Sequence, residues 1–197
     1  MIKTAENLIS EFGSSYKEPY HHLAYLERSK QIFQIKRGLY ETDRTTDPLV
    51  LAGAIVSPSY ISFETALSYY GIIPERSLSC LSATFRIRKN KIFHNVFGTF
   101  AYQDIPEKAY PLATRYLESN GRRFEIATPE KALCDTLSKQ KGMTSIEELK
   151  DWLFVFMRMD SDALLALDSR VIEGLAPLYR KKNVYLFRDY LKGAKKS

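Results

Sequence analysis

The segment at residues 58–75, PSYISFETALSYYGIIPE, constrains the fold most, because it predicts a short helix with a defined beginning and end. Ser62 can cap the N-terminus of this helix, Gly71 can end it, and Pro74 prevents its continuation. We therefore expect residues 62–70 to pack into a hydrophobic core as an architectural element. The apolar side chains that recur at helical spacing, and so define the buried face, are Phe63, Ala66, Leu67 and Tyr70.

The composition is that of a folded protein with an excess of positive charge. A chain of 197 residues with 45% hydrophobic and 13% aromatic residues can bury a sizeable core, in one or two domains. The formal net charge of +6 favours an acidic partner such as nucleic acid. Many soluble proteins of this charge bind no polyanion, so the distribution of charge matters more than its total.

The cysteines and the apolar runs indicate the cellular compartment in which the protein is expected. Cys80 and Cys134 are too few for a disulfide framework or a zinc cluster, and each has apolar neighbours. No apolar run approaches the length of a membrane span, and residues 1–12 lack a signal-peptide core. We therefore expect a cytoplasmic protein with reduced thiols and no membrane partner.

The polar stretch ETDRTTDP at residues 41–48 is the best candidate for a linker. It separates a small module, residues 1–45, from a larger domain, residues 46–197. In the module, Thr4 can cap a helix that ends before Gly13, and Ser15 with Glu18 has capping-box spacing. That spacing predicts a second helix from about position 16 or 19 to about position 30.

A β-favouring stretch follows these helices and turns back on itself. Residues 31–35 partly alternate, and Lys36, Arg37 and Gly38 can form a turn into Leu39. Two helices followed by a short basic hairpin are the outline of a trimmed winged helix-turn-helix, a fold that has three helices in its full form. The module therefore predicts a winged-helix-like DNA-binding unit.

The larger domain is predicted to be α+β, with central strands and a helical C-terminus. Thr128, followed by Pro129, can cap a helix to about position 139, and Ser145 with Glu148 can open another through position 157. Two or three further helical pieces should follow. Residues 49–56 are predicted to be a buried segment, and residues 81–88, 98–102 and 124–127 are predicted to be strands.

Candidate DNA contacts lie in the small module. Lys17, His21, Tyr25 and Arg28 recur at steps of four, four and three, which places them on one helical face. Such a stripe offers donors to phosphates and base edges, although an ordinary solvated helix face has the same composition. The predicted turn beside it carries Lys36 and Arg37, which suit a wing that contacts phosphate or enters a minor groove.

Two further basic clusters have alternative interpretations. If residues 81–88 are a strand, Arg86 and Arg88 share a face with Lys89 and Lys91 nearby, which suits nucleic-acid backbone, an acidic partner or simply solvent. The cluster near the C-terminus suits partner binding or a solvated tail. Its cations are Arg180, Lys181, Lys182, Arg188, Lys192, Lys195 and Lys196, interleaved with Tyr179, Tyr185, Phe187 and Tyr190.

Enzyme signatures are weak, and we expect neither catalysis nor a cofactor. The sequence has no GxxxxGK phosphate loop, no HExxH and no GxSxG, and its three histidines lack metal-ligand spacing with the cysteines. Four carboxylates, Asp104, Glu125, Glu130 and Asp135, could form a degenerate nuclease site. Glu130 and Asp135 are five positions apart on a predicted helix, which is a poor spacing for shared ligation.

Three strings resemble the AbiEi-type antitoxins, the transcriptional-repressor half of abortive-infection toxin–antitoxin pairs. The strings are KRGLY at residues 36–40, PSYISFETALSYYGIIPE and ATPEKAL at residues 127–133, in the family's order. The resemblance covers residues 1–140 well. It implies an N-terminal winged helix that binds repeats in the protein's own promoter. It also implies a C-terminal domain that counteracts a cognate nucleotidyltransferase-like toxin, an activity that need not require a stable complex.

The sequence therefore predicts a DNA-binding autorepressor and antitoxin. Two alternatives stay open: a protein-interaction module whose shortened N-terminal unit does not bind DNA, and a remote nuclease-like enzyme. Salt-dependent promoter binding separates the first from the main hypothesis, and metal-dependent cleavage would identify the second.

Overall fold

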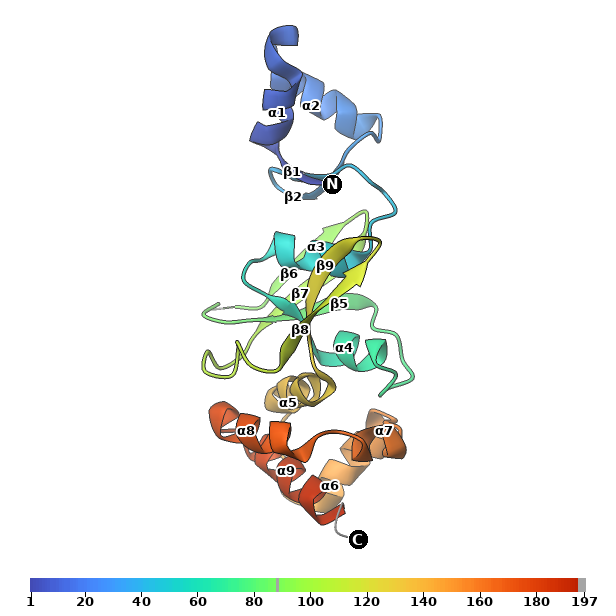
Figure 1. Cartoon of the computed structure of the whole chain (residues 1–197), viewed down its shortest axis with the longest axis vertical. Coiled ribbons are helices and arrows are strands. Elements are labelled where there is room, and N and C mark those ends of the chain that lie inside the picture. The colour runs from blue at the N-terminus through green and yellow to red at the C-terminus, as the bar shows by residue number, and fades with distance from the viewer. Residues whose placement is uncertain (88, 195–197) are drawn as a thin grey trace.

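The computed structural model describes residues 1–87 and 89–194, and its elements form three parts stacked along the long axis (Figure 1). A small α/β unit lies at one end, a mixed six-stranded sheet in the middle and a group of helices at the other end. The predicted α+β class, with central strands and a helical C-terminus, is confirmed. No helix in these described ranges is both long enough and apolar enough to cross a membrane.

The N-terminal unit is a three-stranded antiparallel sheet with two helices on it. The strand order is β1-β3-β2, and the two helices connect β1 to β2. The Thr4 hydroxyl accepts a hydrogen bond from the Asn7 N–H at 3.1 Å, so the predicted first cap is confirmed. The elements are β1 (Ile2–Thr4), α1 (Ala5–Phe12), η1 (Gly13–Ser15), α2 (Pro19–Arg28), β2 (Phe33–Lys36) and β3 (Leu39–Glu41).

The second helix begins at Pro19, one of its two predicted starts, but without the predicted capping box. Ser15 ends the 3-10 turn η1, and α2 begins at Pro19 with Glu18 as an N-cap that makes no side-chain capping bond. The Glu18 carboxylate instead lies 2.7 Å from Nδ1 of His21. The 3-10 turn shortens the helix from its N-terminal side, which leaves Lys17 outside it.

The small unit has a core of its own and also contacts the larger part. Leu8, Leu23, Ile32 and Tyr40 form a separate buried cluster. Ile35, from the same unit, is buried in the main core, where Phe33 packs on Phe97 with ring centroids 6.0 Å apart. The N-terminal unit is therefore docked on the larger part through β2, and the boundary at residue 45 stays a prediction.

The central sheet has the order β6-β7-β5-β4-β9-β8, with two parallel pairs (β4 with β9, β5 with β7) among antiparallel ones. Sequence reasoning missed three of these strands: the two-residue strand β4, and β6 and β8, which lie at the two edges of the sheet. The strands are β4 (Tyr60–Ile61), β5 (Ser79–Thr84), β6 (Lys91–Asn95), β7 (Gly98–Asp104), β8 (Thr114–Ser119) and β9 (Arg122–Ala127).

The strand predicted at residues 81–88 ends at Thr84, and the prediction is wrong for residues 85–87. Arg86 has a φ of 59°, a left-handed conformation that turns the chain out of the sheet. Arg86 therefore does not continue a strand face. Arg88 lies outside the described residues.

Three helices cover the sheet: α3 (Pro48–Ile55), α4 (Phe63–Tyr69) and α5 (Pro129–Lys139). Asp47 caps α3 by accepting from the Leu49 N–H at 2.9 Å, and Thr128 caps α5 as predicted. The segment at residues 41–48 is polar but not a solvated linker throughout, since Glu41 and Thr46 are buried.

The predicted helix at residues 62–70 is confirmed as a core element. Phe63, Ala66 and Leu67 of α4 are buried. Gly71, with φ of 70°, ends the helix in a Schellman arrangement, in which Ile72 N–H donates to the Leu67 carbonyl at 2.9 Å and Gly71 N–H to the Ser68 carbonyl at 3.0 Å.

Ser62 does not form the expected capping hydrogen bond. Ser62 occupies the N-cap position, but its side chain makes no capping bond and donates instead to Asp135 Oδ2 at 2.6 Å. The next residue, Phe63, has a φ of 54°, which bulky residues rarely adopt. The hydroxyl is therefore used for tertiary contact rather than for the helix terminus.

The helices of the C-terminal part pack on α5. Ser145 caps the first of them by accepting from the Glu148 N–H at 3.2 Å, whereas the Glu148 carboxylate binds Thr144 N–H at 2.7 Å rather than closing the predicted box. Tyr179 and Phe187 are buried, as the apolar side of terminal helices would be, and Lys195 and Lys196 lie outside the described residues. The elements are α6 (Ile146–Lys150), η2 (Asp151–Phe156), α7 (Ser161–Leu165), α8 (Ser169–Tyr179) and α9 (Lys182–Ala194).

We predict that Leu67→Ala lowers the free energy of unfolding by about 2–5 kcal/mol, because it empties a fully buried aliphatic site. Ser68→Ala, on the half-buried side of the same helix, is the control and should change stability by less than about 0.5 kcal/mol. Urea denaturation of both variants measures the difference. Equal stabilities would mean that α4 is not a core element.

Candidate nucleic-acid interface

Three of the predicted DNA-contact residues share an exposed face of α2. His21, Tyr25 and Arg28 lie at i, i+4 and i+7 within the helix, and the side chains of His21 and Tyr25 are 84% and 55% exposed, respectively. Lys17 is exposed but precedes the helix, so its predicted place on the stripe is wrong. The face therefore offers an imidazole, a phenol and a guanidinium to a partner.

These side chains make few competing contacts. His21 is an ion-pair partner of Glu18 only when its ring is protonated, and Arg28 Nε donates to the Ala24 carbonyl at a long 3.3 Å. Both contacts are local to α2 and exposed, so a phosphate could replace them at little cost.

An aromatic stack that sequence reasoning missed supports this face. The rings of Tyr16 and His22 stack with centroids 3.7 Å apart and an interplanar angle of 14°, Phe12 packs edge-on against His22, and Tyr25 lies 6.0 Å from it. The recurrence of aromatic residues between positions 12 and 25 was the available signal. The stack links the end of α1 to α2 and limits the movement of the exposed Tyr25 ring.

The predicted basic turn exists, but its two cations have different roles. Gly38, with φ of 75°, allows the turn between β2 and β3, and its carbonyl accepts from Ala5 N–H at 3.0 Å. Arg37 is exposed at this turn. Lys36 is exposed as well, but its Nζ donates to the Ile55 carbonyl at 2.8 Å and so ties the hairpin to α3.

The charge of the small unit is nearly balanced. Residues 1–45 contain seven Lys or Arg and six Asp or Glu, so most of the net charge of +6 lies elsewhere. Phosphate contact by this unit would depend on a few placed cations rather than on a broad positive field.

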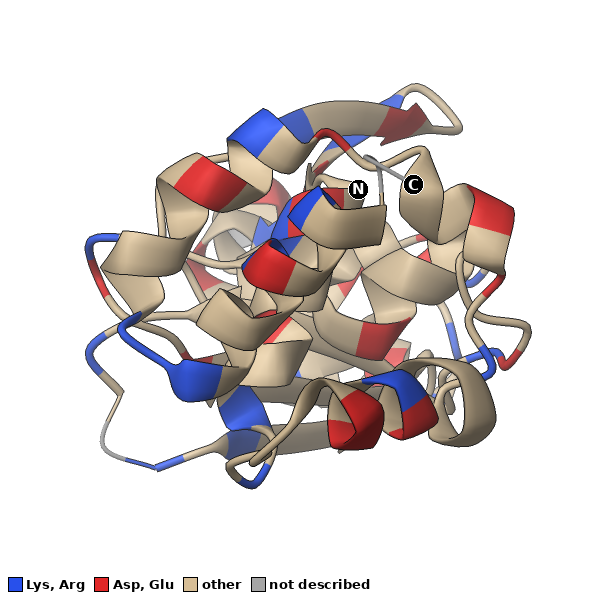
Figure 2. Ribbon diagram, turned by 90° about the horizontal axis from the view of Figure 1, so that it is seen from below, with Lys and Arg blue, Asp and Glu red and all other residues tan. Residues whose placement is uncertain are grey.

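Of the predicted second basic surface, the structure describes Arg86, Lys89 and Lys91. Arg86 forms an exposed two-point ion pair with Glu107, at 2.9 and 2.7 Å, with which a partner's phosphate would have to compete. Lys89 and Lys91 remain exposed, with Lys91 at the start of the edge strand β6. Figure 2, a view from the end that carries the C-terminal helices, shows many Lys and Arg positions in the loops on its left.

Glu41 joins the small unit to the sheet. Its buried carboxylate accepts from Arg122 Nη1 at 2.7 Å and from the backbone N–H groups of Thr42 and Asp43 at 2.9 and 3.1 Å, and it pairs with the Met1 ammonium. Burial works to raise the pKa of Glu41, but the hydrogen bonds from the ammonium and Arg122 outweigh it and hold the pKa below its usual value. Glu41, which the sequence predicts to lie in a linker, therefore holds the small unit on the sheet.

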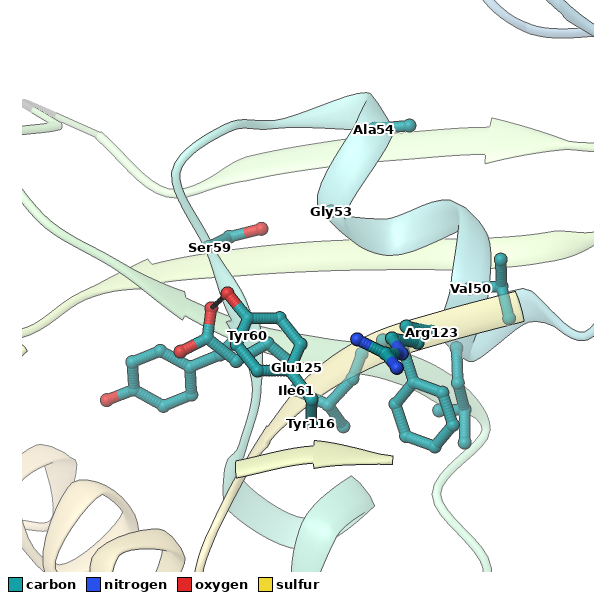
Figure 3. A pocket seen from close by; sticks show the side chains of 11 residues that line it. Val50, Gly53, Ala54, Ser59, Tyr60, Ile61, Tyr116, Arg123 and Glu125 are labelled. Carbon is teal, nitrogen blue, oxygen red and sulfur yellow. Dashed lines mark hydrogen bonds between the residues drawn. The ribbon is translucent and has the colours of Figure 1, made fainter. Parts of the chain in front are cut away.

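A hollow of about 270 Å³ lies between α3 and the hairpin of β8 and β9 (Figure 3). Gly53 and Ala54 of α3 are small residues, so the hollow stays open beside them. The Tyr116 ring lies between the side chains of Arg123 and Glu125. Glu125 accepts from the Thr114 hydroxyl at 2.6 Å. Because its charged groups have opposite signs, this hollow is not a cradle for a nucleic-acid backbone.

The four carboxylates of the nuclease alternative are held by separate partners. Glu130 accepts from Asp168 N–H at 3.0 Å, Asp104 from Ile87 N–H at 3.3 Å, and Glu125 from Thr114. Among residues 1–87 and 89–194, no three His, Cys, Asp or Glu side chains gather as a metal site. Cys80 and Cys134 are buried free thiols, and burial raises the pKa of Cys80 to about 12, which disfavours its thiolate.

Asp135 is the centre of a buried polar network. Its Oδ2 accepts from Tyr60 at 2.9 Å and from Ser62 at 2.6 Å, and its Oδ1 accepts from Lys131 Nζ at 3.1 Å and from the Tyr179 hydroxyl. All five side chains are buried, and burial raises the pKa of both tyrosines and lowers that of Lys131 against the opposing effect of Asp135. The network joins β4, the start of α4, α5 and α8.

Tyr60 and Ser62 come from the string PSYISFETALSYYGIIPE and Lys131 from ATPEKAL, so two of the three strings that resemble AbiEi-type antitoxins meet in this network.

Comparison of the sequence with models of known protein families and with curated proteins finds no match. The likeness to AbiEi-type antitoxins therefore rests on the strings themselves.

We predict that Glu41→Gln lowers the free energy of unfolding at pH 7 by about 1–3 kcal/mol, because it removes a charged hydrogen-bond acceptor from Arg122. The folded-state pKa of Glu41 lies below its ordinary value of 4.5, so its contribution is complete above that pH and is lost as the pH falls through the folded pKa. The variant and the wild type should therefore converge in acid.

Unfolding curves between pH 7 and pH 3 measure this convergence. Glu11→Gln, which removes an exposed ion pair with Lys3, is the control and should have a small effect at every pH. A Glu41→Gln defect that persists unchanged in acid would contradict the assignment.

Proposed function

We propose that this protein is a DNA-binding repressor of its own operon. The observation that carries the proposal is the exposed α2 face of His21, Tyr25 and Arg28, on a unit that also presents Arg37 at a hairpin turn. A helix and a neighbouring hairpin are the two elements with which winged-helix proteins contact a groove and the adjacent phosphates.

The topology of the small unit supports the same proposal. Its elements run strand, helix, helix, strand, strand, and the last two strands form an antiparallel hairpin whose second strand pairs with the first. This order resembles that of a winged helix that lacks its first helix. In this interpretation α2 enters the major groove and the turn at Arg37 is the wing.

We further propose that the larger domain is the antitoxin part and counteracts a cognate nucleotidyltransferase-like toxin in the cytoplasm. The support is the resemblance to AbiEi-type antitoxins together with the way its strings fold. Tyr60, Ser62 and Lys131 converge on Asp135, so strings far apart in the sequence belong to one structural unit. No catalytic step is assigned to this domain.

One observation favours the second candidate, a protein-interaction module that does not bind DNA. The small unit has seven basic and six acidic residues, and Lys36 is engaged by Ile55. The two candidates differ in the salt dependence of promoter binding, because phosphate contacts release counterions from DNA.

We predict that the protein retards a fragment of its own promoter in a gel-shift titration and that affinity falls steeply with salt. Arg37→Ala should reduce the slope of log affinity against log salt by about 0.9, the value for one lost phosphate contact. Tyr25→Ala should weaken binding and leave the slope unchanged, since the phenol carries no charge.

Arg170→Ala is the matched control. Arg170 is an exposed arginine on α8, at the opposite end of the molecule, and its loss should leave both affinity and slope unchanged. Absence of promoter binding at about 50 mM salt, where phosphate contacts are strong, would refute the repressor proposal.

A further inference from the structure

Two large apolar side chains project into solvent from η2. This segment lies between α6 and α7 in the chain, at the end of the molecule far from the N-terminal unit (Figure 1). Val155 is 72% exposed and Phe156 is 73% exposed. Single exposed apolar residues are ordinary, but an adjacent pair flanked by hollows is the pattern of a protein–protein contact.

Phe156 separates two hollows. One has a volume of about 330 Å³, and Ile73, Leu81 and Met157 give it an apolar lining. The other is wider and is formed by Asp151, Trp152, Val155 and Phe156. A side chain from a partner could enter on either side of the Phe156 ring.

The local backbone holds this pair outward. Residues of η2 form a π-helix, and the Met157 N–H donates to the Trp152 carbonyl, five positions earlier, at 2.9 Å. Leu149, Leu153 and Met157 already fill the core from this segment. Val155 and Phe156 are therefore not needed for packing, and π turns of this kind occur often at functional sites.

The charge around the patch identifies the partner's chemistry. Residues 144–168 contain six Asp or Glu and two Lys or Arg, whereas the rest of the chain contains 17 acidic and 27 basic residues. Glu64 and Glu75 also line the smaller hollow, where Arg76 is the basic side chain and Glu75 pairs with Arg158. Because Glu64, Glu75 and Asp151 outnumber Arg76 in the lining of the two hollows, the surface favours Lys and Arg over nucleic acid.

We propose that this surface, defined by Trp152, Val155 and Phe156 with the adjoining hollow of Glu64 and Ile73, binds a basic amphipathic helix of a partner protein. Apolar residues of the helix pack on both sides of Phe156, and its Lys or Arg residues pair with Glu64 and Asp151. This is the helix-in-groove mode of recognition. The proposal deepens the antitoxin role and rests on it for the partner's identity, which would be the toxin.

The single tryptophan of the chain, Trp152, is a reporter within the patch. Titration of the full-length protein with a tryptophan-free amphipathic peptide of Leu and Lys should change Trp152 emission and saturate. A peptide with Glu in place of Lys should produce no saturable change. Phe156→Ser should weaken binding of the Leu and Lys peptide at least tenfold, because large central side chains carry most of the binding energy of an interface.

Ile92→Ser is the matched control, since Ile92 is also a large exposed apolar side chain (61% exposed), on β6. Both substitutions are at exposed positions, so both variants should keep the wild-type melting temperature. Equal binding by Phe156→Ser and the wild type would overturn the proposal, as would equal binding of the two peptides. Concentration-dependent dimerisation that Phe156→Ser abolishes would assign the surface to a second copy of this chain and also overturn it.

Co-expression with the protein encoded beside it separates this proposal from the proposed function. We expect Phe156→Ser to lose protection against a toxin encoded there and to retain promoter binding. Unaltered protection by Phe156→Ser would refute the docking surface and leave the antitoxin role standing. A wild-type protein that gives no protection would refute the antitoxin role itself.

Discussion

The carboxylate of Asp135 is the contact on which the rest of the structure depends. It is fully buried and accepts hydrogen bonds from three hydroxyl groups and the Lys131 ammonium, so each oxygen serves two donors. An ionised group without partners would be very costly in such a place, and here every partner comes from a different turn or element. The network therefore fixes β4, α4, α5 and α8 relative to one another.

The parts at the two ends of the molecule are attached to this central framework. Toward the N-terminus, Glu41 with Arg122 and Lys36 with Ile55 hold the small unit on the sheet, while its helices face outward. Toward the C-terminus, α5 and α8 carry the remaining helices, from which Val155 and Phe156 project. The proposed DNA-binding face and the proposed partner surface thus lie at opposite ends of one framework, and a partner could occupy one without blocking the other.

Local sequence patterns predicted the ends of several helices correctly. They did not predict the hydrogen bonds that polar side chains form with residues far away in the sequence. The caps at Thr4 and Thr128 and the stop at Gly71 were correct because each depends on neighbouring residues alone. Strands β6 and β8 were missed because edge strands with exposed side chains on both faces lack a clear alternation. Ser62 was assigned to a cap, and Asp135 to a possible metal site, since nothing local shows that they meet across 73 positions. Of the DNA-contact candidates, Lys17 lies outside the helix because a 3-10 turn precedes it, and Lys36 makes a tertiary hydrogen bond that no local pattern indicates.

The most direct test of this account is the unfolding free energy of Asp135→Asn, measured together with promoter binding. Asparagine keeps the shape but removes the charge that compensates Lys131, so we predict a loss of about 3–5 kcal/mol, the range for one partner of a buried pair. Promoter affinity per folded molecule should be unchanged, because the network lies far from α2. A variant with wild-type stability, or one that is stable but no longer binds the promoter, would contradict the view that Asp135 is the architectural centre of the fold.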